Sequence, residues 1–295
     1  MQRSYNILMK KILFFILFSS PIFAAPNVVV SIKPIHSIVS NITQGVTTPK
    51  LLIKDSQSPH YFHLKPSQIS LVNQADLLIS VHPSIEEGIA KILNNIDIQR
   101  KLYVVEKSFQ QRNSEHQEHE EHQHGAKDYH IWLNIDAMQK FSIKLTNKLI
   151  AIDADNRLTY QSNLSVFNKK LDTLKKHIKK QLLPYRKTPM VTYSNAFWYF
   201  IQANQLNALA RVVEDHELKP SVKNILNARK TIRSTSAQCL ISTIEITPKR
   251  VRNIIENLDI KHRSVDIIGF KQTQGVLQYP ALMQNIADAF EKCLK

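Results

Sequence analysis

The chain has 295 residues, of which 43% are apolar, and it carries 39 basic against 24 acidic side chains. A chain of this length and composition can bury a substantial core, in two domains or two lobes, and is neither disordered nor fibrous. Its five glycines form neither a GxGxxG nor a GxxxxGK[ST] motif, and no HExxH or GxSxG sequence occurs. These absences argue against the usual nucleotide-binding loops, zincin proteases and serine hydrolases of the GxSxG type.

The first 25 residues have the pattern of a secretory signal peptide. Three basic residues precede an unbroken apolar run from Ile12 to Phe18, and small residues end the stretch at Ala25. Seven apolar residues are far short of the roughly 20 needed to span a bilayer, so a membrane anchor is the weaker alternative. We therefore expect a cleaved signal peptide and an exported protein.

After this segment, short β-branched runs alternate with helical stretches, which is the pattern of parallel βαβ units. In the first half of the chain, strands are expected at 28–32, 51–54, 77–81 and 102–105. Helical segments such as 66–73 and 85–94 lie between them. This half is therefore predicted to form one α/β lobe.

Two further segments contain histidines. One follows the predicted strand at 51–54, and the other comes just before an apolar stretch. SPHYFHLKPS at 58–67 puts His60 and His63 in a turn bounded by prolines, and DYHIWLN at 128–134 contains His130. A lone histidine is more often a core or surface residue than a metal ligand. These residues alone therefore leave the structural and the metal-binding interpretations open.

Residues 115–124 read EHQEHEEHQH and include nothing that a core could bury, so we expect a flexible loop. Imidazoles and carboxylates are suitable ligands for Zn²⁺ and related ions. Four of the chain's 12 histidines gather in this segment, namely His116, His119, His122 and His124. Metal capture is therefore favoured over a merely solubilising role.

A long amphipathic helix is predicted over 155–183. Its apolar residues recur at steps of three and four, and neither Gly nor Pro occurs before Pro184. At 1.5 Å per residue the helix would be about 40 Å long, which is enough to brace one lobe against another. Its polar face carries six lysines without interleaved aromatic residues, so we interpret it as a solvated face and expect no nucleic-acid partner.

The second half repeats the alternation of strands and helices, with strands expected at 190–193, 208–213, 239–244 and 264–268. Two α/β lobes follow from this pattern. The chain's two cysteines, Cys239 and Cys293, both lie in the second half. In an exported protein they can form one disulfide, with two buried free thiols as the alternative.

Several of these segments, in the same order, resemble the ZnuA-type zinc-specific solute-binding proteins of ABC transporters. The resemblance rests on NVVVSIKPIHSIVSNITQGV, SPHYFHLKPSQISLVNQADLLISV, the His-rich loop followed by YHIWLN, the central helix, TYSNAFWYF and the cysteine pair. It covers nearly the whole mature chain. SIKPIHS is shared with manganese-binding and adhesin-like relatives, whereas the His-rich loop and the cysteines favour zinc.

This resemblance implies two pseudo-symmetric α/β lobes, each a mainly parallel sheet flanked by helices, joined by one long rigid helix. The expected parts are a signal peptide at 1–25, an N-terminal lobe at 26–154, a connecting helix at 155–184 and a C-terminal lobe at 185–295. The expected function is that of a periplasmic, monomeric binding protein rather than an enzyme, which delivers zinc to the permease of an ABC transporter. The alternative is an adhesin-like relative, or one whose altered site binds metal weakly or prefers manganese.

The ligands implied by the resemblance are His60 and His130 from the first lobe and Asp266 from the second. One position departs from the family pattern, because 194–196 read Ser-Asn-Ala where relatives have His-Asp-Ala. The imidazole expected in place of Ser194 is therefore missing. We expect a site of His60, His130 and Asp266 completed by water or His63, with weaker or less selective zinc binding than in typical members.

Overall fold

The computed structural model of the chain describes residues 25–54, 58–105, 128–214 and 218–295. Residues 1–24 of the expected signal peptide lie outside the described residues. The His-rich segment at 115–124 also lies outside them, with His116, His119, His122 and His124. Within the described part of the chain, every helix is too short or too polar to cross a membrane.

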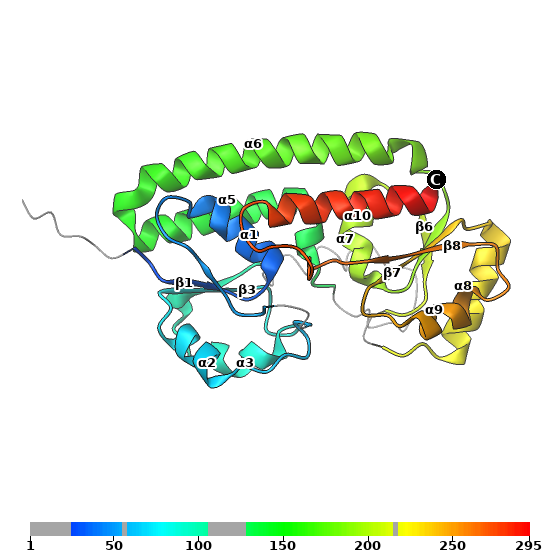
Figure 1. Cartoon of the computed structure of the whole chain (residues 1–295), viewed down its shortest axis with the longest axis horizontal. Coiled ribbons are helices and arrows are strands. Elements are labelled where there is room, and N and C mark those ends of the chain that lie inside the picture. Colours follow the sequence, from blue (N-terminus) through cyan, green and yellow to red (C-terminus); the bar gives the residue numbers. More distant parts are fainter. Residues whose placement is uncertain (1–24, 55–57, 106–127, 215–217) are drawn as a thin grey trace, which may run out of the picture.

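The first sheet contains four parallel strands in the order β2-β1-β3-β4 (Figure 1). Its strands are β1 (Val28–Val30), β2 (Lys50–Leu51), β3 (Leu77–Ser80) and β4 (Lys101–Tyr103). Every residue of the central strands β1 and β3 is buried, because helices cover both faces of the sheet. The accompanying helices are α1 (Lys33–Ile42), α2 (Pro66–Asn73), α3 (Glu87–Leu93) and the short 3₁₀ helix η1 (Ile98–Arg100).

The second sheet repeats this topology in the order β6-β5-β7-β8, again with all strands parallel. Its strands are β5 (Met190–Thr192), β6 (Ala208–Arg211), β7 (Cys239–Thr243) and β8 (Lys261–Val265). The helices between them are α7 (Trp198–Asn204), α8 (Val222–Thr235) and α9 (Pro248–Ile255). In both sheets the second strand in sequence is at one edge and the fourth at the other, which confirms the predicted fold of two similar parallel α/β lobes.

The last strand differs from its prediction, because β8 begins at Lys261 rather than at 264. This strand lies at the edge of the second sheet, and Lys261, Arg263 and Ser264 are exposed. Because an exposed edge strand buries few side chains, its sequence contains no apolar run. The prediction therefore placed the strand on the apolar residues that follow it. Two of those, Ile267 and Ile268, are buried in the loop after β8.

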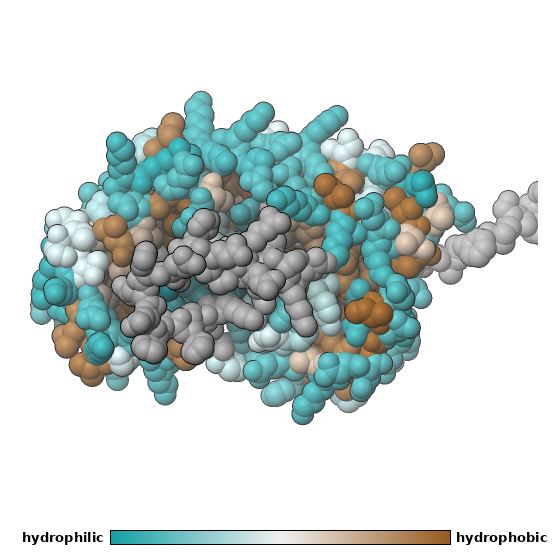
Figure 2. Space-filling view, turned by 180° about the vertical axis from the view of Figure 1, so that it is seen from behind, coloured by the Kyte–Doolittle hydropathy of each residue, from teal (hydrophilic) through white to brown (hydrophobic). Residues whose placement is uncertain are grey.

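A layer of helices joins the two sheets. The predicted long helix is confirmed as α6 (Arg157–Leu182), which follows the 3₁₀ turn η3 (Ala154–Asn156) and leads into η4 (Leu183–Tyr185). It buries the apolar side chains of Tyr160, Phe167, Leu171, Ile178 and Leu182. α5 (Ile135–Ile152) and α10 (Gln278–Leu294) pack beside it across both lobes (Figure 1). Figure 2 shows that the edge of the molecule formed by α6 is hydrophilic, as the amphipathic pattern predicts.

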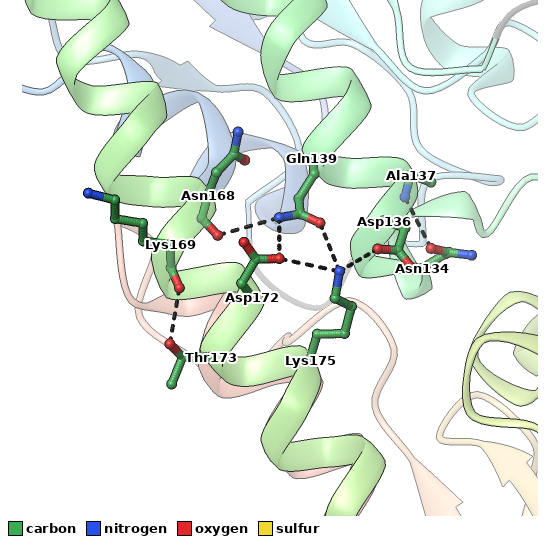
Figure 3. Close-up of polar contacts among 9 residues, drawn as sticks. All are labelled: Asn134, Asp136, Ala137, Gln139, Asn168, Lys169, Asp172, Thr173 and Lys175. Atoms are coloured by element: carbon green, nitrogen blue, oxygen red, sulfur yellow. Dashed lines mark hydrogen bonds and ion pairs between the residues drawn. The ribbon is translucent and has the colours of Figure 1, made fainter.

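Polar contacts fix α6 against α5 (Figure 3). The ammonium group of Lys175 lies 2.6 Å from Asp136 Oδ1 and 3.3 Å from Asp172 Oδ1. Gln139 Nε2 donates to Asp172 Oδ1 at 3.0 Å. The hydrogen bond to Asp136 raises the pKa of Lys175, so the lysine stays charged in this setting.

One apolar core extends through both lobes, with members on β1 and β3, on β5 and β7, and on the three long helices between the sheets. The disulfide that the sequence predicted is present, because Cys239 on β7 and Cys293 on α10 are bonded. This bond attaches the last helix to the central strand of the second sheet. The lobes are therefore parts of one continuously packed body.

Candidate metal centre

The structure brings His60 and His130 together, with their ring centroids 6.2 Å apart. His60 is half-buried in the turn between β2 and α2, and His130 is 5% exposed just before the 3₁₀ turn η2 (Ile131–Leu133). Two imidazoles on one tetrahedral zinc ion have ring centres about 5 Å apart, given Zn–N distances of about 2.0–2.1 Å. The observed separation is therefore about 1 Å larger than the one that a shared zinc ion would require.

His130 is oriented by a carboxylate that the sequence analysis did not single out. Its ring Nδ1 lies 2.6 Å from Asp128 Oδ1, and its backbone N–H donates to the same oxygen at 2.9 Å. A carboxylate only accepts hydrogen bonds when ionised, so in neutral His130 the proton sits on Nδ1 and Nε2 carries the lone pair. This carboxylate–histidine arrangement is the one that typically orients zinc-binding imidazoles. The Asp-x-His spacing was the available sequence signal.

Residues of the second lobe contact the segment that contains His130. Tyr199 on α7 donates from its hydroxyl to Asp128 O at 3.3 Å. Trp132 Nε1 donates to Ile267 O, in the loop after β8, at 2.8 Å. The indole of Trp132 also packs against the His130 ring, with centroids 5.1 Å apart. The His130 segment therefore lies where the two lobes touch.

Asp266 follows β8, and its carboxylate organises the loop that comes next. Oδ1 accepts the backbone N–H groups of Ile268 at 3.0 Å and Gly269 at 2.7 Å, and Oδ2 accepts that of Phe270 at 2.7 Å. Gly269 has φ +78°, and a Cβ there would lie only 2.2 Å from Gln278 Nε2, so the tight loop requires glycine. Three of the roughly four acceptor positions of the carboxylate are thus used, which leaves one on Oδ2.

The described residues contain no group of three His, Cys, Asp or Glu side chains placed to hold a metal ion together. The structure thus pairs His60 with His130, but it does not bring Asp266 into the same cluster. His63, the possible auxiliary ligand, is exposed. The complete ligand set stays a prediction.

Ser194, where the resemblance implied a histidine, is the second residue after the end of β5. It is 1% exposed, and its Oγ accepts the backbone N–H of Ala196 at 3.4 Å. This hydrogen bond caps the 3₁₀ turn η5 (Asn195–Phe197) that leads into α7. The serine therefore has a local structural role at the carboxyl end of a central strand.

The sequence analysis also did not single out a buried acid of the first lobe, Glu86, which lies close to the segment that contains His130. Glu86 is fully buried before α3, and its Oε2 accepts the backbone N–H groups of Val81 at 2.7 Å and His82 at 3.1 Å. Burial raises the pKa of Glu86 to about 7, although these hydrogen bonds lower it and so offset part of the effect. The His82 ring stacks on Tyr129, the neighbour of His130, with centroids 4.7 Å apart. Glu86 thus holds a turn at the carboxyl end of β3.

Comparison with known proteins gives a consistent family assignment. The family model of ZnuA, the periplasmic component A of a zinc-uptake complex, matches residues 28–293. The high-affinity zinc uptake system protein ZnuA of Haemophilus ducreyi is 28% identical over 294 residues, covering 92% of this chain and 94% of that protein. The protein of the same name from Brucella abortus is 26% identical over 305 residues, covering 91% of each.

Solved structures show the same fold. A crystal structure of ZnuA superposes with a TM-score of 0.73 at 17% identity, covering 92% of this chain and all of that one. The zinc-bound ZnuA-like domain of AdcA from Streptococcus pneumoniae has a TM-score of 0.69 at 15% identity, covering 91% of this chain and 98% of that domain. The laminin-binding protein Lbp of Streptococcus pyogenes has a TM-score of 0.73 at 15% identity, with coverage of 92% and 100%.

Proposed function

The chain belongs to the ZnuA family of periplasmic zinc-uptake components, and from this membership we propose that it captures a zinc ion between its lobes for delivery to an ABC permease. The observation that carries the proposal is the proximity of His60 and His130, with Asp128 orienting the second ring. The coordination chemistry of zinc supports it, because neutral imidazole is a preferred ligand. In this account zinc is the cargo of the protein.

The proposed site takes one nitrogen from each of His60 and His130. On the second lobe, Asp266 would bind through Oδ2, because its Oδ1 already accepts two N–H groups. Water or His63 would complete four ligands. Asp266 must move closer to His60 and His130 before all three can bind one ion. Zinc binding would therefore draw the loop after β8 toward the two histidines.

Replacing the family's histidine by Ser194 has a functional consequence for a transported ion. Fewer fixed nitrogen ligands make the complex weaker and less selective for zinc over manganese, which accepts oxygen ligands readily. Weaker binding also makes release easier. We propose that affinity is set by His60 and His130, and that selectivity is lower than in relatives with the third imidazole.

Three further features are part of the proposal. Residues 1–25 act as a cleaved signal peptide that exports the chain to the periplasm. The disulfide between Cys239 and Cys293 supports this location, because such bonds persist in oxidising compartments. The His-rich segment at 115–124 adds weaker zinc-binding capacity, and the mature protein acts as a monomer.

A competition titration of the purified mature chain against a chromogenic zinc chelator tests the site. We expect one tight zinc ion per chain, and a loss of at least roughly tenfold in affinity in His60→Ala and in His130→Ala, or about 1.4 kcal/mol each. His177→Ala is the matched control, because this histidine is exposed on α6. Unchanged tight binding in both site variants would place the zinc elsewhere.

Deleting 115–124 separates the tight site from the His-rich segment. We expect the deletion to remove weak extra equivalents and to leave the tight ion in place, because that segment contributes none of the proposed site ligands. Isothermal titration calorimetry measures both classes of binding in one experiment. Loss of the tight ion on deletion would assign it to the His-rich segment instead.

A further inference from the structure

Residues 81–88, which we call the β3–α3 turn, connect the third strand of the first sheet to the first residues of α3 (Figure 1). The carboxyl group of Glu86 closes this turn by accepting the backbone N–H groups of Val81 and His82. The carbonyl oxygen of His82 accepts the N–H groups of Ile85 at 3.1 Å and Glu86 at 3.3 Å. Ile85 is 4% exposed and belongs to the core. The turn is therefore closed by its own hydrogen bonds and anchored in the first lobe.

One end of the β3–α3 turn packs against the segment that contains His60. Gly88 has no side chain, and a Cβ there would collide with the carbonyl oxygen of Phe62 and lie 3.0 Å from its carbonyl carbon. The φ of Gly88 is not positive, so this close approach, rather than an unusual backbone conformation, requires glycine. Phe62 is 3% exposed and lies between His60 and His63. Contact with Gly88 therefore fixes how closely the His60 segment approaches α3.

The other end of the β3–α3 turn packs against the segment that contains His130. The ring of His82 stacks on that of Tyr129, with centroids 4.7 Å apart and an angle of 18° between the ring planes. Tyr129 directly precedes His130 in the chain. The ring of Tyr103, on β4, lies 6.4 Å from that of His82. One short turn thus contacts the segments of both histidines.

The separation of the two imidazoles decides whether they can share an ion. Their ring centroids are 6.2 Å apart, whereas two imidazoles on one tetrahedral zinc ion need about 5 Å. Metal–ligand distances in a functional site vary by only about 0.2 Å, so ligands depend on the residues that support them. Because both histidine segments pack on the β3–α3 turn, a change in this turn alters their separation directly.

We propose that the β3–α3 turn is the common support that sets the separation of His60 and His130, with Gly88 and His82 as its positioning residues. Each of the two acts through the residue it contacts rather than by binding the ion. This inference rests on the proposed function, because the separation matters only if both rings bind one zinc ion.

Gly88→Ala tests the His60 side of the support. The added methyl group must push the backbone of Phe62 away, and we expect zinc affinity in the competition titration to fall at least roughly tenfold. Gly45→Ala is the matched control, because Gly45 has φ +82° and a Cβ there would meet nothing within 4 Å. This control is expected to lose stability through backbone strain but to keep zinc affinity within about twofold of wild type.

Two further measurements separate positioning from a general loss of stability. In a His60→Ala background the displaced segment carries no imidazole, so we expect Gly88→Ala to change zinc affinity there by less than about twofold. The visible spectrum of the cobalt-substituted protein depends on coordination geometry. We expect Gly88→Ala to weaken the tetrahedral cobalt bands and Gly45→Ala to leave them unchanged.

His82→Ala and His82→Phe test the His130 side. Phenylalanine keeps a flat ring that can stack on Tyr129, whereas alanine removes the ring. Both substitutions lose the hydrogen bond that the Ser84 N–H donates to His82 Nδ1, so this loss cancels in the comparison. We expect zinc affinity to fall at least roughly fivefold in His82→Ala and to stay within about twofold of wild type in His82→Phe. This pair carries the test if thermal melting shows that Gly88→Ala does not fold.

Three results would overturn the inference. Equal zinc affinities in folded Gly88→Ala and Gly45→Ala would show that Gly88 does not position the His60 segment. A loss in Gly88→Ala that persists in the His60→Ala background would show that the effect does not pass through His60. Equal losses in His82→Ala and His82→Phe would show that the imidazole itself, rather than a stacked ring, matters at position 82. Failure of the wild type to bind zinc would instead refute the proposed function, which is a separate result.

Discussion

At the scale of single residues, the orientation of His130 depends on Asp128. Its Nδ1 lies 2.6 Å from Asp128 Oδ1, which leaves Nε2 as the nitrogen that would bind zinc in the proposed site. In Asp128→Asn the acceptor loses its charge, and we expect zinc affinity to fall about tenfold to hundredfold. The competition titration measures this change. Asp172→Asn, at an exposed residue of α6, is the control. Equal affinities in Asp128→Asn and wild type would show that the pair does not orient the ligand.

The buried carboxyl group of Glu86 is expected to make the folding stability of the protein depend on pH. Its pKa is raised by burial from 4.5 to about 7, so the folded protein keeps a proton that the unfolded chain releases. The contribution of this group to stability is therefore present below about pH 4.5 and is lost as the pH rises to about 7, by on the order of 3 kcal/mol. Glutamine has the same shape and can accept the same two N–H groups, but it does not ionise.

We therefore expect Glu86→Gln to become progressively more stable than wild type as the pH rises from 5 to 8. Urea unfolding of the two proteins across this range measures the difference, in which the contributions of all other titrating groups largely cancel. A difference that is constant with pH would mean that Glu86 does not change its protonation in this range.

Ser194→His tests the departure from the family pattern. If this position faces the ion, a third imidazole replaces water and zinc affinity rises at least roughly tenfold, or about 1.4 kcal/mol. Because Ser194 is 1% exposed, the larger side chain is also expected to lower stability, by about 1–3 kcal/mol. The gain in affinity should vanish in a His60→Ala background. Unchanged affinity in folded Ser194→His would remove this position from the site.

At the scale of the elements, central strands and the long helix were predictable from the sequence. β1 and β3 are buried apolar runs, and α6 has a regular amphipathic pattern, so local pattern and tertiary burial agree. The edge strand β8 was misplaced, because its residues are mostly polar and exposed. Periodicity gives no information about a strand that buries little.

The candidate site was predictable only in part. His60 and His130 lie 70 residues apart, and only the family resemblance paired them. Asp128 is recognisable by its spacing to His130 once the histidine is singled out. The contact of Trp132 with Ile267 joins segments 135 residues apart, and it depends on how the lobes pack rather than on any local pattern.

The disulfide gives a prediction about the last helix. Cys239 and Cys293 are separated by 54 residues and join β7 to α10. The chain-entropy estimate for a loop of this length is about 4 kcal/mol of stability. We expect the double variant Cys239→Ser, Cys293→Ser to lose about that amount in urea unfolding, relative to oxidised wild type. A loss below about 1 kcal/mol would show that packing alone fixes α10.

At the scale of the whole molecule, contacts between the lobes are numerous and specific. Lys33, at the start of α1, donates to Phe270 O at 2.7 Å and to Gln272 O at 3.3 Å. Tyr279, near the start of α10, donates its backbone N–H to Ser37 Oγ at 3.0 Å. These hydrogen bonds fix the loop after Asp266 to the first lobe. The movement needed to bring Asp266 to the histidines is therefore expected to be local.

The central claim is that one zinc ion binds to His60 and His130 where the lobes meet. Crystals of the zinc-loaded mature protein, measured at the zinc absorption edge, locate the ion directly by anomalous scattering. The account predicts one strong peak about 2.0–2.1 Å from His130 Nε2 and from a ring nitrogen of His60, with Asp266 Oδ2 turned toward it. A strong peak elsewhere, with none between these two imidazoles, would contradict it.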